Sequence, residues 1–94
     1  MKDVLFFYTT TCPHCKQADK LIEEIKKENA KYEGIVIRKV DENLNPDFSD
    51  KFDYYYIPCM FVDGKKYIEG ENCTKENLIA MFDAALGWKL CNNR

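Results

Sequence analysis

An apolar run followed by two closely spaced cysteines constrains the fold of this chain more than any other feature. Val4–Tyr8 is continuously apolar and β-prone, and Cys12-Pro13-His14-Cys15 follows after a short polar segment. Such a run is typical of a central strand buried on both faces of a sheet. Proline suits the first turn of a helix, where its missing N–H costs nothing. The paired thiols are therefore predicted to lie where a strand ends and a helix begins.

The next segment predicts a strand–helix–strand unit. The helix that starts at Pro13 is expected to fade over residues 29–32, and a second strand is predicted over residues 35–40. The long crossover between the strands makes them parallel, with a right-handed connection. Asn45 is expected to cap a short helix that starts at Pro46. The first helix has an apolar face with helical spacing, formed by Ala18, Leu21, Ile22 and Ile25.

The remaining chain predicts a hairpin and a final helix. Cys59–Val62 is predicted as a strand, Asp63-Gly64 as a tight turn, and residues 65–68 as the returning edge strand. Thr74 is expected to cap a helix that stops at Gly87. The fold class is therefore α/β, in the order β-α-β-α-β-β-α, with a four-stranded mixed sheet and three flanking helices. The apolar positions of the last helix are Leu78, Ile79, Phe82, Ala85 and Leu86.

Length, charge and cysteine count narrow the class of protein. The 94 residues suffice for one domain, residues 1–94. A net charge of −2 argues against a nucleic-acid surface and disfavours a membrane surface. The opening apolar run is too short for a signal peptide or a membrane span, which for a complete chain predicts a cytoplasmic protein. Five cysteines cannot all pair within one chain, and this fits a reducing compartment.

The spacing of Cys12 and Cys15 suits thiol–disulfide exchange. That reaction needs one thiolate that attacks a disulfide and a second thiol that resolves the mixed disulfide. Free N–H groups and the helix dipole would stabilise a thiolate on Cys12, while Cys15 would lie one turn deeper. We therefore expect Cys12 to be the nucleophile and Cys15 the resolving thiol.

The same spacing also occurs in metal sites. Zinc sites use two cysteines separated by two residues, but a structural zinc site needs a second such pair. Here the other cysteines, Cys59, Cys73 and Cys91, are scattered. A non-catalytic metal or iron–sulfur binder that uses Cys12 and Cys15, with or without Cys59, remains an alternative.

Most of the chain resembles the thioredoxin superfamily. The stretch from Val4 to Cys15 is similar to its active-site strand and helix, and residues 39–46 and Ile57-Pro58 follow the order and spacing of thioredoxins. The extra N-terminal strand and helix of thioredoxin are missing, so the layout is the trimmed one of glutaredoxins. The resemblance implies a thioredoxin fold and a monomeric oxidoreductase for protein disulfides, with no metal or organic cofactor. It also implies a cis bond at Ile57-Pro58 facing the cysteines.

The resemblance further implies roles for residues around the pair. Pro13-His14 matches the bacterial disulfide-bond oxidants, and His14 is expected to stabilise the Cys12 thiolate. Together with the two cysteines, Pro13 and His14 form the expected catalytic residues. The expected substrate-binding residues are Thr11, Ile57 and Pro58.

Several positions depart from the family patterns. Phe6 stands where thioredoxins place a buried aspartate, and Thr9 stands where glutaredoxins have a lysine. Where glutaredoxins have two successive glycines before acidic residues, this sequence has only one, in Glu69-Gly70-Glu71. The reductant is therefore either a thioredoxin reductase, which we favour, or glutathione, which would make the protein a glutaredoxin.

Several residues keep two interpretations. Cys59 is either a third redox thiol or a small hydrophobic residue of the core. Lys39 either assists proton transfer or is a solvated charge at a strand end, and residues 54–56 either line a partner groove or pack on the short helix. Cys73 and Cys91 are interpreted as incidental thiols, and Trp88 as a packing anchor.

Overall fold

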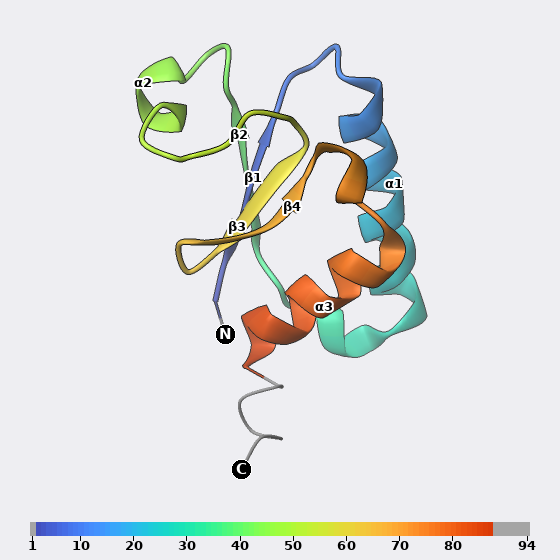
Figure 1. Cartoon of the computed structure of the whole chain (residues 1–94). Helices are drawn as coiled ribbons and strands as arrows, with labels where there is room; N and C mark the ends of the chain where they lie inside the picture. Colours follow the sequence, from blue (N-terminus) through green and yellow to red (C-terminus); the bar gives the residue numbers. More distant parts are fainter. Residues whose placement is uncertain (1, 88–94) are drawn as a thin grey trace.

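Four strands form one mixed sheet in the order β2-β1-β3-β4 in the computed structural model, which describes residues 2–87 (Figure 1). β1 (Val4–Tyr8) pairs in parallel with β2 (Ile37–Asp41) and antiparallel with β3 (Cys59–Val62). β3 forms a hairpin with β4 (Lys65–Glu69). The predicted four-stranded mixed sheet is thereby confirmed.

The helices lie on both faces of this sheet. The long helix α1 (Pro13–Glu28) and α3 (Lys75–Leu86) cover one face, and the short α2 (Pro46–Ser49) lies on the other side (Figure 1). Two single turns of 3-10 helix, η1 (Ala30–Tyr32) and η2 (Gly70–Asn72), complete the elements. Across residues 2–87, no helix has both the length and the apolar character needed to pass through a bilayer.

The alternation of side chains along the strands divides the core into two clusters. Phe6 and Met60 point to the face covered by α1 and α3, and they pack there with the buried side of both helices. Phe7 and Cys59 point to the opposite face, where the Phe7 ring stacks on Tyr54 with 4.9 Å between ring centroids. Both central strands are thus covered on two sides, as the apolar run at Val4–Tyr8 predicts.

The turns and caps agree with the residues that form them. Asp63 and Gly64 both have positive φ, 53° and 81°, which is the conformation of a two-residue hairpin turn. The hydroxyl of Thr74 accepts the backbone N–H of Asn77 at 3.1 Å and caps α3 as predicted. α3 ends at Gly87 in the left-handed conformation that glycine favours.

Some predicted boundaries are wrong. β2 begins at Ile37 and not at Ile35, because the Ile35 N–H bonds back to the Tyr32 carbonyl at the end of η1. Asn45 precedes α2 but makes no side-chain cap, since its amide donates to the Asp41 carbonyl at 3.0 Å. Met81, absent from the predicted apolar set of α3, is fully buried. The interpretations of Trp88 and Cys91 concern positions outside the described residues.

Candidate functional site

Cys12 is the N-cap residue of α1. Its backbone is extended, Pro13 occupies the first helical position, and the Cys12 Sγ accepts the backbone N–H of Cys15 at 3.1 Å. The sulfur therefore lies at the end of α1 where unpaired N–H groups and the positive end of the dipole favour a negative charge. The Cys12 side chain is half-buried, which leaves part of it open to a reaction partner.

Cys15 occupies a different environment one turn along the helix. It is only 2% exposed and belongs to the core cluster beneath α1 and α3. Burial and a hydrogen bond with the Cys12 thiol raise the pKa of Cys15 to about 12. Both residues are free thiols in this structure. The pair thus combines an accessible sulfur at a helix start with a protonated sulfur behind it.

A groove of about 550 Å³ adjoins the first turn of α1. We call it the His14 groove, and its lining residues are His14, Tyr56, Ile57, Glu69, Gly70 and Glu71. The peptide bond between Ile57 and Pro58 is cis, so the predicted cis geometry of this bond is confirmed. The Pro58 side chain is fully buried, and the two residues before it, Tyr56 and Ile57, form one wall of the groove. Thr11 is exposed at the turn that leads into Cys12.

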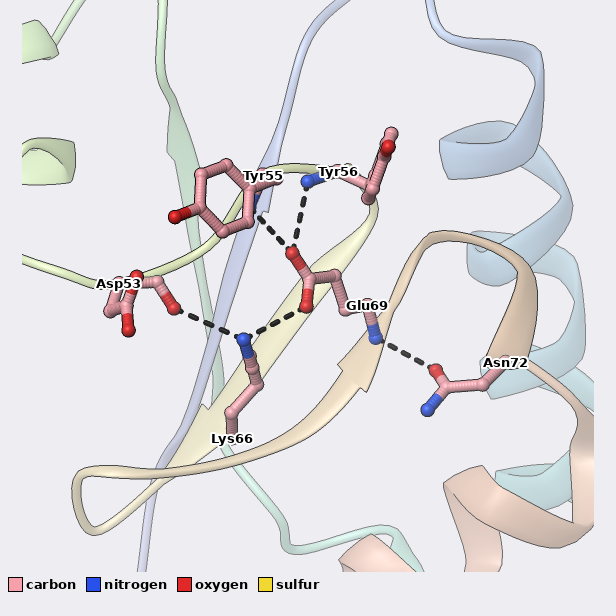
Figure 2. A network of polar contacts seen from close by, with 6 residues as sticks. All are labelled: Asp53, Tyr55, Tyr56, Lys66, Glu69 and Asn72. Atoms are coloured by element: carbon pink, nitrogen blue, oxygen red, sulfur yellow. Dashed lines mark hydrogen bonds and ion pairs between the residues drawn. The ribbon is translucent and has the colours of Figure 1, made fainter.

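Glu69, at the end of β4, also lines this groove and is hydrogen-bonded to the backbone of the wall (Figure 2). Its Oε2 accepts the backbone N–H groups of Tyr55 and Tyr56, and its Oε1 pairs with the Lys66 Nζ at 2.8 Å. The bond with Lys66 lowers the pKa of the Glu69 carboxyl most, and the bonds from the two backbone N–H groups lower it further. The sequence carries one weak signal of this network, which is a glutamate directly before a glycine at a strand end; the pattern by itself indicates only half of a glycine pair.

Cys59 lies apart from the pair. It sits on β3 in the core cluster with Phe7 and Phe61, on the sheet face opposite to that of Cys15. The thiol is completely buried, and burial raises its pKa to about 12. This placement favours the small-hydrophobic interpretation over a third redox thiol. Cys73 is half-buried and packs against the core cluster that contains Cys15, and burial raises its pKa to about 11.

Other predicted residues have defined partners. Lys39 forms an ion pair with Asp19 at 3.0 Å, and its ammonium lies 4.6 Å from the centroid of the Tyr8 ring. Phe6, at the position of the missing aspartate, is fully buried in the cluster that contains Cys15. Within residues 2–87, no three histidine, cysteine or acidic side chains gather in a way that would hold a metal ion.

Comparisons with known proteins agree with this geometry. The family model described as Thioredoxin matches residues 2–84. The chain is 31% identical over 80 residues to protein disulfide-isomerase A4 of Bos taurus, an alignment that covers 80% of this chain and 12% of that protein. It is 31% identical over 86 residues to a protein disulfide-isomerase of Ricinus communis, covering 87% of this chain and 17% of that protein. The chain thus spans less than a fifth of the length of these relatives.

The fold also matches solved structures. The X-ray structure of thioredoxin from Fasciola hepatica superposes with a TM-score of 0.65 at 20% sequence identity. That match covers 89% of this chain and 80% of the other. At this level of identity the similarity concerns the arrangement of strands and helices.

Proposed function

This chain belongs to the thioredoxin family, and we propose that it is a thiol–disulfide oxidoreductase that acts on protein disulfides through Cys12 and Cys15. The observation that carries the proposal is the asymmetry of the pair. Cys12 caps α1 and its Sγ accepts a backbone N–H at 3.1 Å, whereas Cys15 is buried behind it. The similarity to two protein disulfide-isomerases supports the same chemistry.

The proposed reaction has two exchange steps. The Cys12 thiolate attacks one sulfur of the substrate disulfide, whose S–S bond breaks as the Cys12–substrate bond forms, and the other substrate sulfur leaves and takes up a proton. Cys15 then loses its proton and attacks the Cys12 Sγ, which releases the second substrate thiol. The substrate disulfide is reduced by two electrons, and the Cys12–Cys15 pair is oxidised to a disulfide.

The positions of the two sulfurs suit the order of these steps. Because the pKa of Cys15 is raised to about 12, this thiol stays protonated at neutral pH while Cys12 attacks. The backbone N–H of Cys15 meanwhile stabilises negative charge on the Cys12 Sγ. Cys12 therefore reacts first, and Cys15 acts only after the mixed disulfide has formed next to it.

The groove would hold the substrate chain. His14 is exposed at its edge and two residues from Cys12, so a protonated or hydrogen-bonding imidazole would favour the thiolate. Tyr56 and Ile57 offer an aromatic and an aliphatic surface to the residues that flank the substrate disulfide. We propose that Thr11 and the cis Ile57-Pro58 backbone also contact that segment, and that a thioredoxin reductase recycles the oxidised pair.

Reduction of insulin disulfides driven by dithiothreitol tests this function. The wild-type protein should accelerate precipitation of the insulin B chain, and Cys12→Ser should return the rate to that of dithiothreitol alone. Cys73→Ser is the matched control, because it removes a half-buried thiol outside the pair. Stoichiometric zinc or iron that is lost with Cys12→Ser, together with no turnover by the wild type, would contradict the proposal and support the metal-binding alternative.

A further inference from the structure

We infer that Glu69 is a positioning residue for substrate binding, because its carboxylate fixes the backbone of Tyr55 and Tyr56 and thereby the wall of the His14 groove. The inference rests on the proposed function, and it adds a residue that lies on the far hairpin strand, remote in sequence from the cysteine pair. Glu69 itself makes its bonds to the wall and not to the reacting sulfurs.

The first support is the hydrogen bonding of the segment that leads to Pro58. Residues 53–58 form no helix or strand, so their N–H groups lack the partners that regular structure provides. A single oxygen, Glu69 Oε2, accepts both successive N–H groups, that of Tyr56 at 3.1 Å (Figure 2). Bonds from N–H groups to a carboxylate are stronger than those to a neutral oxygen. The carboxylate therefore defines where this part of the wall lies.

The second support is Lys66, which ties the start of the same segment to β4. Its Nζ pairs with the Glu69 Oε1 at 2.8 Å and donates to the Asp53 carbonyl at 3.1 Å (Figure 2). The side chains of Glu69 and Lys66 are 20% and 34% exposed, so water screens this pair only in part. The segment is thus held at Asp53 by the lysine and at Tyr55 and Tyr56 by the glutamate.

The third support is the close approach at Gly70. A Cβ placed on Gly70 would lie 3.0 Å from the Cβ of Tyr56, and the Gly70 N–H donates to the Pro58 carbonyl at 2.8 Å. Asn72 fixes the end of β4, since its Oδ1 accepts the Glu69 N–H at 2.7 Å. Tyr56 nevertheless remains 69% exposed, so its position depends on these backbone contacts and not on burial of its ring.

These contacts separate substrate binding from thiol reactivity. The Cys12 Sγ is held by the N-terminus of α1, and Glu69 contributes nothing to that bond. Loss of the carboxylate should therefore weaken the binding of a polypeptide that uses the wall, while a small disulfide that needs only Cys12 should react as before. The expected signature is a change in KM for the protein substrate without a change in the small-disulfide rate.

Steady-state kinetics of Glu69→Ala with insulin and with hydroxyethyl disulfide test the inference. We expect KM for insulin to rise roughly tenfold, since two charge-assisted bonds are lost, and the rate with hydroxyethyl disulfide to stay within about twofold. Glu69→Gln keeps an acceptor oxygen for the two N–H groups and should fall between wild type and Glu69→Ala. Glu28→Ala is the matched control, because it removes a glutamate that pairs with Lys75 at 2.8 Å on another part of the surface.

Amide hydrogen exchange measured by NMR supplies a readout that does not depend on activity. The amide hydrogens of Tyr55 and Tyr56 should exchange at least about tenfold faster in Glu69→Ala than in the wild type. In Glu28→Ala their exchange rates should be unchanged. Unchanged exchange and unchanged KM would overturn the inference, as would equal losses with both substrates in a folded variant. If the wild type reduces neither disulfide, the proposed function fails, and the amide data alone decide whether Glu69 positions the wall.

Discussion

At the scale of single residues, Cys12 and Cys15 share one helical turn but have opposite surroundings. Cys12 is half-buried at the start of α1, and Cys15 is 2% exposed. Cys12→Ser should therefore abolish exchange, whereas Cys15→Ser should accumulate a mixed disulfide on Cys12, because the resolving thiol is missing. Mass spectrometry of the trapped adducts checks this. Adducts that form equally well on Cys15 in Cys12→Ser would reverse the assignment.

His14 is expected to make the pair more oxidising. Stabilising the Cys12 thiolate stabilises the reduced protein, and each tenfold gain in thiolate corresponds to about 1.4 kcal/mol, or roughly 30 mV for this two-electron couple. We expect the reduction potential of the wild-type protein to lie above that of thioredoxin, which is about −270 mV. In His14→Pro the potential should be lower than in the wild type. Redox titration against glutathione mixtures measures both. An unchanged potential in His14→Pro would leave His14 without a tuning role.

Cys59 gives a prediction about alkaline stability. Its pKa is raised to about 12 in the folded protein and is about 8.5 in an unfolded chain. The folded state keeps the proton, so this contribution to stability is complete below about pH 8.5 and is lost as the pH rises toward 12. In reduced protein, Cys59→Ala should make the decline between pH 9 and 10.5 shallower, by up to about 1.4 kcal/mol per pH unit.

Urea denaturation at several pH values, with reductant present, measures that decline. Cys15 contributes in the same direction, since its pKa is also raised to about 12, so Cys59→Ala should reduce the slope without removing it. Insulin reduction by Cys59→Ala should match the wild type. A loss of that activity in the folded variant would instead make Cys59 part of the redox site.

At the scale of elements, the start of α3 depends on one side chain. The Thr74 hydroxyl accepts the Asn77 N–H at 3.1 Å and so satisfies a donor that the helix leaves unpaired. Thr74→Ala should lower the free energy of unfolding by about 1 kcal/mol, and Thr74→Ser should restore most of it. Urea denaturation at neutral pH checks both values. Equal stability of the alanine and serine variants would show that the cap is not used.

The elements also decide where the candidate site lies. β1 is a central strand of the sheet and ends at Tyr8, and α1 starts at Pro13. The turn between them places Cys12 at one end of the fold (Figure 1). β4 reaches the same groove at Glu69, whose carboxylate is hydrogen-bonded to the backbone of the wall at Tyr56. The site is thus assembled from a helix start, a turn before β3 and the end of an edge strand.

At the scale of the whole molecule, we predict that a thioredoxin reductase, and not glutathione, is the preferred reductant. Thr9 stands where glutaredoxins have a lysine, and the Glu69 carboxylate is engaged by Lys66 and two backbone N–H groups. Loss of one charge-assisted contact would weaken glutathione binding by about 1.5–3 kcal/mol, which is roughly one to two decades of affinity. We therefore expect faster recycling by NADPH with a thioredoxin reductase.

Two coupled assays measure this preference. One supplies oxidised protein with NADPH and a thioredoxin reductase, and the other supplies NADPH, glutathione and glutathione reductase. NADPH consumption should be faster in the first. Rapid turnover with glutathione and none with the thioredoxin reductase would make the protein a glutaredoxin.

The local sequence determined much of the fold and the identity of the thiol pair. The apolar run at Val4–Tyr8, the helical spacing of the apolar residues in α1 and the turn at Asp63-Gly64 each depend on neighbouring residues, and all three are as predicted. The position of Cys12 at a helix start also follows locally, because proline fits the first turn of a helix without cost and disrupts a helix interior.

Tertiary structure decided the features that depend on distant contacts. The period of a strand places Cys59 on one of two faces, but only the packing against Phe7 and Phe61 shows that this face is opposite to Cys15. Glu69 meets Tyr55 and Tyr56 across 14 and 13 positions of sequence, respectively, through the hairpin of β3 and β4. Such contacts have no local periodicity, because they exist only once the chain has folded and brought unpaired N–H groups to a carboxylate.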